Sequence, residues 1–421
     1  MQFRDDRRGQ AIQIGAVLLL GAVVLSLSIY QASVVPEQNR EIEFKHSQQV
    51  QDQLGDARNA IVSTGSTGDG RSVSVQMGTQ YPSRIIAMNP SPPSGRLSTV
   101  GTTDGSVNVT VSNATATGET GHFWVGTDRS YNTGAIVYRP GYNEYTSAPT
   151  TWYENSVLFD EFRDANLTVT DQRLVDGDRI SLVTLNGSYY TSRSGSAALD
   201  FRPVSTSTRT VSVTNATATS NVTITVPTRL NASDWEALLA EEMDSGHVAS
   251  VTTAGVTGED YRMLRITLDR LDEEGQRMTY DLDIARVGVG TQVVRPDAAY
   301  LTDVAGNGST VPENGETQFT VEIRDALNNP KKDVRVVAGT RWGNSSVSPE
   351  SATTDSDGQV TLVYDAPEDI DGVTQGTDRV QVSLNTSLSD TVNGTAINGS
   401  TAENVSMVVR VDNSDGSGLD S

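Results

Sequence analysis

The sequence predicts a mainly β protein held by one long amino-terminal helix. Residues 11–35 form an uncharged, largely apolar run, and residues 36–64 continue it with apolar side chains at helical spacing. Beyond residue 70, short stretches alternate branched apolar with polar residues between Gly, Asn, Asp and Pro turns, which is typical of antiparallel sheets with one solvated face. We therefore expect a transmembrane helix extended into a stalk helix, a β-sandwich-like middle region and a carboxyl-terminal β-sandwich.

The apolar run is long enough to cross a lipid bilayer as a helix. Its 25 residues would span roughly 37 Å at about 1.5 Å per residue, which exceeds the roughly 30 Å of a hydrocarbon core. A removable secretory signal fits poorly, because its apolar region is roughly 7–15 residues long. We expect residues 11–35 to contact the bilayer as a single-pass anchor, with the basic tail 1–10 in the cytoplasm and the body extracellular.

The helical pattern does not stop at the membrane. An apolar stripe with a spacing of three or four follows Pro36, at Ile42, His46, Val50, Leu54, Ala57 and Ile61. The Gly-rich stretch "STGSTGDG" at 63–70 should then end the helix. We predict one nearly continuous helix, kinked near Pro36, whose amphipathic part at 36–64 lifts the following domain away from the lipid.

A short basic tail is followed by Gly9 and Gln10 and then by an apolar helix that runs on into an amphipathic half. This order of features resembles the amino terminus of type IV pilins and archaeal class III signal proteins. The resemblance implies that a dedicated peptidase cuts between Gly9 and Gln10 and that the helix then packs against its neighbours in a filament. Ile14 stands where many family members carry a glutamate, and Asp5 and Asp6 interrupt the basic tail. The alternative is an uncut anchor with an incidental Arg-Gly pair.

The middle region, residues 65–295, reads as one β-rich unit or as two sheet units. "VSNATAT" at 111–117 recurs as "VTNATAT" at 213–219, although convergence of Thr-rich strands explains so short a repeat better than duplication. One helix is predicted over 231–246. Ser233 and Glu236 stand in a capping-box relation at its start, and an apolar face with Trp235 should cover a sheet.

Residues 296–412 carry further strands at a spacing that suggests an immunoglobulin-like sandwich. The segments "VEIRDALNNPKKDVRVVAG" and "TTDSDGQVTLVYDAP" resemble bacterial Ig-like domains of the invasin and intimin type, whose turn and strand-start motif is matched by Asp355, Asp357, Gly358 and Val360. Lys332 or Asp333 replaces the family glycine after the Asn-Asn-Pro turn. The resemblance implies a spacer or an adhesive tip on a cell surface. The acidic, Gly/Ser-rich tail 413–421 should be disordered.

All glycosylation sequons lie on the carboxyl-terminal side of the apolar run. The candidate acceptors are Asn108, Asn113, Asn166, Asn186, Asn215, Asn221, Asn231, Asn307, Asn344, Asn385, Asn393, Asn398 and Asn404. Basic residues near the run favour a cytoplasmic amino terminus by only three to two. As a group, the sequons therefore support the expectation that the body is extracellular.

Composition excludes several classes of function. The formal net charge of −22 makes nucleic acid an improbable partner, because phosphate would be repelled. Of the 31 basic residues 28 are arginine, and such an acidic, Lys-poor chain resembles proteins of salt-loving archaea. The chain has no cysteine, which excludes disulfides, thiolate metal sites and Cys-linked lipid anchors.

The sequence gives little sign of catalysis. The three histidines, His46, His122 and His247, show no metal-ligand spacing and are expected at the surface, and hydrolase and phosphate-loop motifs are missing. No cofactor is expected. Calcium is a minor alternative at two acidic clusters, one of Asp355 and Asp357, the other of Asp365, Glu368, Asp369 and Asp371.

We therefore expect a membrane-anchored, non-catalytic glycoprotein of the cell surface, which displays β-sandwich domains for adhesion or envelope structure. Its expected partners are the bilayer and an envelope or surface ligand. The alternative is a pilin-like subunit, processed after Gly9, that self-associates through the amino-terminal helix into a surface filament. A third reading, an ectoenzyme, rests on abundant carboxylates and on Trp124, Trp152 and Trp342, which are more often sandwich core.

Overall fold

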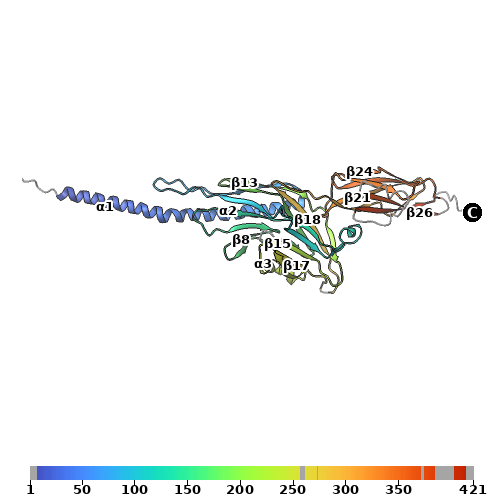
Figure 1. Cartoon of the computed structure of the whole chain (residues 1–421), viewed down its shortest axis with the longest axis horizontal. Coiled ribbons are helices and arrows are strands. Elements are labelled where there is room, and N and C mark those ends of the chain that lie inside the picture. The colour runs from blue at the N-terminus through green and yellow to red at the C-terminus, as the bar shows by residue number, and fades with distance from the viewer. Residues whose placement is uncertain (1–6, 257–260, 273, 371–373, 385–402, 414–421) are drawn as a thin grey trace, which may run out of the picture.

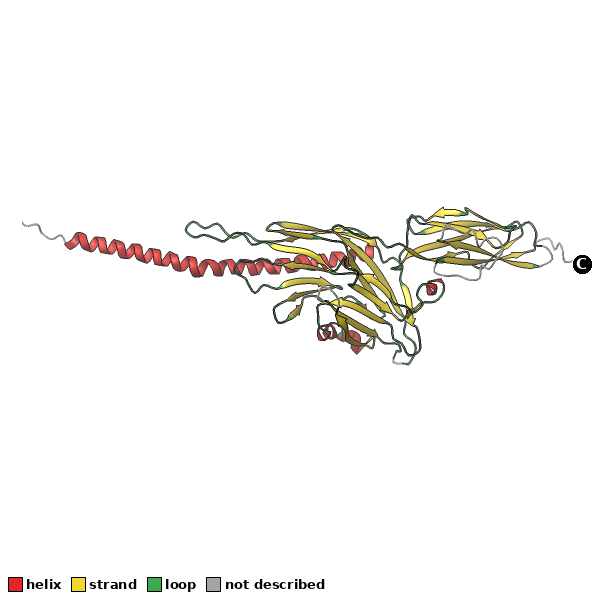
Figure 2. Cartoon of the chain, viewed as in Figure 1, coloured by secondary structure: helices red, strands yellow, loops and turns green. Residues whose placement is uncertain are grey.

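The computed structural model describes residues 7–256, 261–272, 274–370, 374–384 and 403–413. One helix extends from one end of the molecule, a β-rich body lies in the middle, and a β-sandwich lies at the opposite end (Figure 1). We call residues 71–294 with the helix segment that packs on them the body, and residues 298–412 the sandwich. Strands are the main regular element of both parts, which confirms the predicted mainly β class (Figure 2).

The amino-terminal helix is continuous across its proline. It consists of α1 (Arg7–Ile29), a five-residue π-turn (Tyr30–Val34) and α2 (Val35–Thr67). Pro36 has no N–H, and its ring crowds the carbonyl four residues earlier, so the wider π-turn directly before it accommodates the misfit. Gly68 ends the helix in the left-handed region, with φ 78°. The expected helix is therefore present, and its irregularity is a π-turn.

Three sheets build the body. The largest contains, in spatial order, β1 (Arg71–Gln76), β13 (Ser196–Ser205), β18 (Tyr280–Val289), β11 (Arg179–Asn186) and β10 (Val175–Asp176), with β14 (Val211–Asn215) beside β18 and β4 (Ala114–Thr115) beside β14. The second contains β12 (Tyr190–Arg193), β2 (Gly95–Val100), β6 (Ala135–Arg139), β7 (Thr150–Glu154), β8 (Val157–Glu161) and β9 (Asn166–Thr168). The third contains β16 (Val248–Val256), β17 (Arg262–Leu268), β15 (Thr223–Thr228), β3 (Asn108–Ser112) and β5 (Arg129–Asn132).

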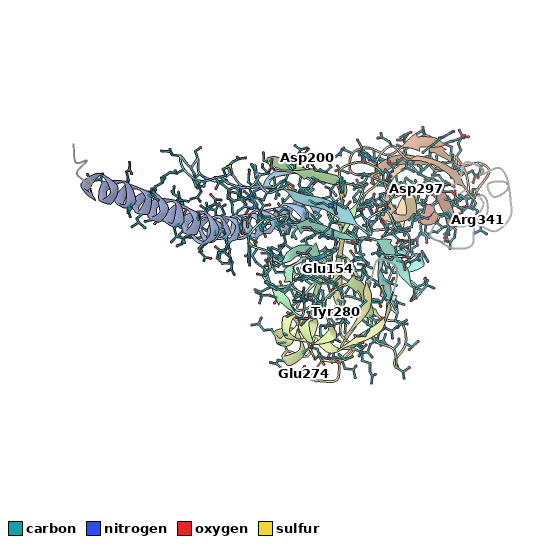
Figure 3. The ribbon with its side chains drawn as sticks, turned by 60° about the vertical axis from the view of Figure 1, so that its left-hand side comes forward. Glu154, Asp200, Glu274, Tyr280, Asp297 and Arg341 are labelled. Carbon is teal, nitrogen blue, oxygen red and sulfur yellow. The ribbon has the colours of Figure 1, made fainter. Side chains whose placement is uncertain are left out.

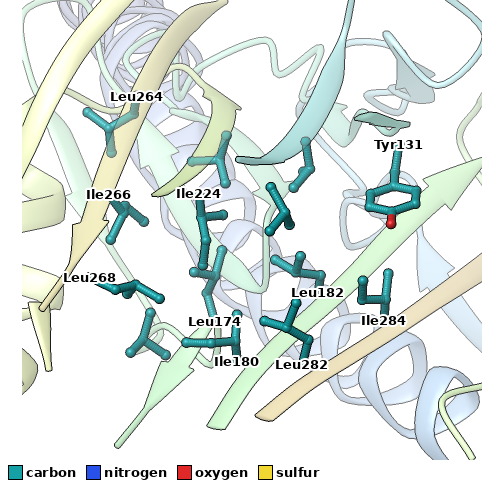
Figure 4. Close-up of a cluster of buried hydrophobic side chains, with 14 of the residues drawn as sticks. Tyr131, Leu174, Ile180, Leu182, Ile224, Leu264, Ile266, Leu268, Leu282 and Ile284 are labelled. Atoms are coloured by element: carbon teal, nitrogen blue, oxygen red, sulfur yellow. The ribbon is translucent and has the colours of Figure 1, made fainter. Parts of the chain in front are cut away.

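The main core of the body lies between the first and third sheets. Figure 4 shows side chains of β11 and β18, among them Leu182 and Ile284, facing those of β15 and β17, such as Ile224 and Ile266. Along β17 and most of β11 these positions alternate with more exposed ones, as the sequence pattern predicts, whereas the central strand β18 is buried on both faces. Trp124 and Trp152 are each 1% exposed and belong to this core, as expected, and Trp342 packs partly buried against the core of the sandwich.

The repeated heptapeptides lie side by side and do not mark equivalent places in two sheets. β14 pairs antiparallel with β4, so that Asn215 faces Ala114 and Thr214 faces Thr115. β3, from the first copy, belongs to the third sheet, whereas β14 joins the first sheet through β18. This arrangement favours convergence over duplication.

The helix predicted over 231–246 forms as two short pieces. They are α3 (Ala232–Leu238) and α4 (Ala240–Asp244), with the buried side chains of Trp235 and Leu239 on the core side. The predicted capping box was wrong by two residues, because the helix begins before Ser233. Asn231 is the N-cap, and the side chain of Asp234 accepts a hydrogen bond from the N–H of Asn231. A 3₁₀ turn (Glu119–His122) is the other short helical element of the body.

The second half of α2 is a core element of the body. Val50, Leu54 and Ile61 are at most 2% exposed and pack with residues of β1, β13 and β18. Close to the end of α2, a Cβ on Gly65 would come within 3.1 Å of Ala285, so the helix lies directly on the sheet. The amphipathic segment expected to lift the body away from the lipid is thus packed against the body by its apolar face, because the apolar stripe needs a partner.

The sandwich consists of two packed sheets with a shared apolar core. One contains β19 (Ala298–Ala305), β21 (Glu316–Asp325), β25 (Gln359–Asp365) and β23 (Ser346–Ser348). The other contains β20 (Ser309–Pro312), β27 (Asn404–Asp412), β26 (Gln375–Ser383), β22 (Arg335–Thr340) and β24 (Ser351–Thr353). At the turn where the family carries glycine, Asp333 adopts φ 61°.

Candidate membrane anchor and its seat in the body

The apolar half of the long helix is exposed on all its faces. Ile12, Leu19 and Leu25 are 73%, 70% and 63% exposed, and α1 extends well beyond the body in Figure 1. The helix from Ile12 to Thr67 contains a stretch that is long and apolar enough to cross a membrane by length and composition, and none of that stretch is buried. Apolar surface all round a helix is stable only in apolar surroundings.

Gly9 and Gln10, the residues expected to flank a cleavage site, lie within the first turns of α1. Ile14 follows on the exposed helix surface. Residues 1–6, with Asp5 and Asp6, lie outside the described residues.

A buried carboxylate on α2 holds a loop of the body. Glu43 is fully buried, and its oxygens accept the backbone N–H groups of Asn143 at 2.9 Å, Glu144 at 2.8 Å and Tyr145 at 2.6 Å. The hydroxyl of Tyr81, from the loop between β1 and β2, donates to the same carboxylate. Three successive N–H groups converging on an anion form the kind of concavity that binds a carboxylate strongly. Glu43 therefore joins the helix to two loops at once.

His46 lies one turn further along this face. Its Nδ1 is 2.6 Å from the hydroxyl of Tyr142, and the two rings meet edge to face. Only 4% of His46 is exposed, so the expectation of a surface histidine was wrong for this residue. Burial lowers the pKa of His46 and raises that of Tyr142, which favours the neutral form of both side chains. Asn39, one turn before Glu43, is also fully buried and accepts from Arg84 at 3.2 Å. Together, Glu43, His46 and Asn39 form what we call the polar seat of α2.

The loop between β1 and β2, residues 77–94, is clamped to the helix where the apolar run ends. The side-chain amide of Gln31 donates to the carbonyl of Met88 at 2.9 Å and accepts from its N–H at 3.0 Å. Arg84 of the same loop donates to the hydroxyl of Tyr30 at 3.2 Å and to Gln38 at 2.6 Å. Figure 1 shows this loop projecting from the body alongside the helix.

The sandwich is joined to the body by a polar and aromatic junction. Asn329 donates to the carbonyl of Ile284 at 2.7 Å, and Phe123 stacks on Tyr300 with ring centroids 4.7 Å apart. Arg209 of the body pairs with Glu322 of the sandwich at 2.8 Å. These contacts place the sandwich at the end opposite to α1.

The candidate glycosylation sites differ in accessibility. Asn186 and Asn215 are 5% and 4% exposed, and their amides bond within the fold, so the folded chain cannot carry a glycan there. Asn385, Asn393 and Asn398 lie outside the described residues. The prediction is thereby narrowed to partly or fully exposed asparagines, which are Asn108, Asn113, Asn166, Asn221, Asn231, Asn307, Asn344 and Asn404.

In the acidic clusters considered for calcium, Asp355 and Asp365 accept hydrogen bonds from within the fold. Asp355 accepts the N–H groups of Asp357 and Gln359, both at 2.9 Å, and Gly358 completes the turn with φ 71°. Asp371 lies outside the described residues, and Asp365 accepts a hydrogen bond from Ser346. Within the described ranges, no three His, Asp or Glu side chains come together as a metal site.

The remaining histidines make local contacts. His122 is 3.1 Å from Glu119 in the 3₁₀ turn. His247 lies between Ser245 at 2.9 Å and Asp178 at 3.5 Å. Ser245 also donates to the carbonyl of Glu242 at the end of α4, and Asp178 lies in the turn between β10 and β11.

The sequence reading missed Glu43, Tyr81 and the loop that carries Ile85 and Ile86. In the sequence, Glu43 is one of several acidic residues between the apolar positions of the helix, and nothing sets it apart from them. The available signal for the loop was a pair of isoleucines between Pro82 and a Pro/Ser-rich stretch, which is unusual for a surface turn.

Comparisons with known proteins identify no family. No protein-family model matches the chain. An uncharacterized protein of Archaeoglobus fulgidus is 23% identical over 399 residues, covering 90% of this chain and 63% of that protein. The chain thus spans less than two thirds of the length of this relative.

Among solved structures, the D00-D0 domain of intimin is 12% identical with a TM-score of 0.23 and covers 48% of this chain and 91% of that one. Domains 4 and 5 of the S-layer protein SbsC are 13% identical with a TM-score of 0.20 and cover 33% and 60%. The Escherichia coli adhesin FdeC is 14% identical with a TM-score of 0.19 and covers 82% and 94%. Superpositions this loose show no shared arrangement of whole chains, and no function is carried over from them.

Proposed function

We propose that the chain is a membrane-anchored, non-catalytic surface protein in which α1 spans the bilayer and the body and sandwich stand outside it. One observation carries the proposal: a single continuous helix has one half exposed on every face, while the other half buries its apolar face in the body. The first half suits lipid and the second half suits a protein core. The body cannot leave the anchor without losing part of its own core.

The orientation follows from the ends of the helix. The ten-residue basic tail is easily retained in the cytoplasm, whereas the exposed sequons lie on the body and the sandwich. The sandwich, farthest from α1, is the part best placed to meet an envelope component or another cell (Figure 1). The strongly acidic composition suits an exterior of high salt, where repulsion between its charges is screened.

A second candidate is a pilin-like subunit cut between Gly9 and Gln10. The observation that favours it is the same exposure of α1, since helices of further copies could cover its apolar surface as well as lipid does. After cutting, Gln10 would be the first residue of the mature chain.

Mass spectrometry of the mature amino terminus separates the two candidates. A chain that retains Met1 or Gln2 and stays with membranes after alkaline extraction supports the static anchor. A chain that starts at Gln10 and is recovered in filaments supports the second candidate. Replacing Leu19 and Val23 by arginine should release the chain from the membrane in the first case.

A further inference from the structure

The loop between β1 and β2 presents three large apolar side chains outward. Ile85, Met88 and Ile86 are 103%, 82% and 74% exposed, more than any other large apolar side chain in the described part of the chain. They are close together in sequence, between Pro82 and Pro90. Exposed apolar side chains gathered in one loop generally mark a contact with a partner or a membrane.

This loop and the apolar helix form the two walls of one open hollow. The helix wall consists of Leu19, Ala22, Val23 and Leu27, and the loop wall includes Ile85 and Ile86. Both walls are therefore largely apolar. The hydrogen bonds of Gln31 with Met88 and of Arg84 with Tyr30 hold the loop against the helix.

The depth of the loop follows from the helix beside it. Leu19 and Leu27 are eight positions apart, about 12 Å along a helix axis, and both lie inside the run 11–35 that spans the bilayer under the proposed function. Val23 is the middle residue of that run, so the stretch reaches from close to the bilayer midplane into the half of the span nearer the body, and side chains that face it lie at these depths. The body is outside the cell under the proposed function, so this half is the outer leaflet.

We propose that the loop is a second membrane contact, whose side chains Ile85, Ile86 and Met88 enter the outer leaflet beside α1. This inference rests on the proposed function. Lipid acyl chains fill the hollow, and the amide of Gln31 bonds the backbone of Met88, because an irregular backbone in lipid needs hydrogen-bonding partners. Arg84, Tyr30 and Tyr81 then lie where cationic and aromatic side chains are favoured, at the membrane interface.

Two contacts with the bilayer have a mechanical consequence. A body held by one helix alone can turn about the helix axis, whereas a second contact to one side restricts that rotation. The polar seat transmits the restriction to the body, because Tyr81 of the loop and the N–H groups of 143–145 share the carboxylate of Glu43. The sandwich would then be held at a set orientation relative to the surface.

The absence of cysteine from the chain allows a direct test. Ile86→Cys, Leu20→Cys and Val304→Cys are made separately in the full chain, labelled with an environment-sensitive fluorophore and reconstituted at low density into phosphatidylcholine and phosphatidylglycerol vesicles. Quenching lipids carry the quencher at a shallow or a deep position of the acyl chain. Leu20 reports the helix, and Val304, 48% exposed in the sandwich, is the matched control for an exposed apolar position.

We expect the label at position 86 to lose emission with the shallow quencher, and the label at 304 to keep its emission with both. The proposal is overturned if position 86 behaves like position 304 while position 20 is quenched, which leaves the anchor intact. It is also overturned if position 86 is shielded only as protein density rises, since a second copy then fills the hollow. If position 20 is not quenched by either lipid, the proposed function itself fails, and this inference with it.

Discussion

Arg209 of the body donates hydrogen bonds from two nitrogens to the carboxylate of Glu322 in the sandwich. Its Nε lies 3.2 Å from each carboxylate oxygen, and its Nη2 lies 2.8 Å from Oε2. Glu322, 1% exposed, also accepts from Arg324 at 2.7 Å and from Gln359 at 3.2 Å. Burial alone would raise the pKa of Glu322, but the hydrogen bonds and charges of the two arginines outweigh it and lower that pKa. The junction therefore holds an ionised carboxylate away from water.

Replacing Arg209 by alanine should weaken this junction. A charge-assisted hydrogen bond contributes about 2 kcal/mol, and Arg324 remains to neutralise Glu322, so we expect a loss of about that size in the free energy of unfolding. The loss should shrink as pH falls through the lowered pKa of Glu322, since protonation removes the charge that Arg209 stabilises. Chemical denaturation at several pH values measures it. Arg335→Ala, which removes an exposed arginine of the same sandwich, is the control and should change little.

Replacing Glu43 by alanine should release the loop after β6, residues 143–145, from α2. Three backbone N–H groups lose their acceptor in a buried place, at a cost of about 3 kcal/mol or more. Hydrogen exchange at Asn143, Glu144 and Tyr145 should accelerate. Glu41→Ala on the same helix removes a solvent-exposed carboxylate paired only with Lys45 and should leave these amides protected. Equal rates of hydrogen exchange at these amides in the two variants would show that Glu43 does not hold the loop.

The buried Glu154 predicts a specific dependence of stability on pH. Figure 3 places it inside the body; burial raises its pKa to about 7 from an ordinary 4.5, although Thr228 and the N–H of Arg229 donate to it. The folded state therefore holds a proton that the unfolded chain releases, so this residue's contribution to stability falls as pH rises from 4.5 to about 7 and is constant above.

Glu154→Gln should remove that part of the pH dependence. The free energy of unfolding of the variant, relative to the unmodified chain, should increase by about 3 kcal/mol across the window, at roughly 1.4 kcal/mol per pKa unit. Glu236→Gln, at an exposed position of α3, is the control. Parallel curves for the unmodified chain and Glu154→Gln would show that the carboxyl is ionised throughout.

The left-handed backbone conformation of Asp333 predicts that glycine is tolerated or stabilising at this position. Its φ of 61° is a conformation that glycine adopts without strain, and its side chain is 79% exposed, so little contact is lost. Asp333→Gly should raise the melting temperature slightly or leave it unchanged, whereas Asp333→Val should lower it. Calorimetry of the two variants tests this, and a stability loss on going to glycine would point to a role for the carboxylate.

The parts of the fold that sequence could predict are those set by local periodicity. The uncharged run 11–35 is long enough to form a helix across a bilayer. The stripe at Val50, Leu54 and Ile61 predicts a helix because apolar residues three or four positions apart lie on one helix face. The strands follow from alternation in the same way, and the resemblance to Ig-like domains located the turn at Asp355. The capping box was predicted at the wrong residues, because both Asn231 with Asp234 and Ser233 with Glu236 have the spacing of a capping box near the start of the helix.

The seat of the helix could not be predicted, because it depends on contacts between distant segments. Glu43 looks like any solvated carboxylate until residues 143–145 are brought to it, one hundred positions later in the chain. Gln31 meets Met88, and Arg84 meets Tyr30, each across more than fifty positions. Ile85 and Ile86 stand out in the sequence as an apolar pair, but the hollow that they line exists only because the fold brings the loop beside α1.

The central claim, an anchor in the bilayer with the body outside, is tested most directly by cysteine accessibility in intact cells. Val304→Cys in the full chain should react with a membrane-impermeant maleimide before lysis, whereas Gln2→Cys should react only after lysis, and both chains should sediment with membranes. Recovery of the full-length chain in the cytosolic supernatant, with Val304→Cys labelled only after lysis, would contradict the account.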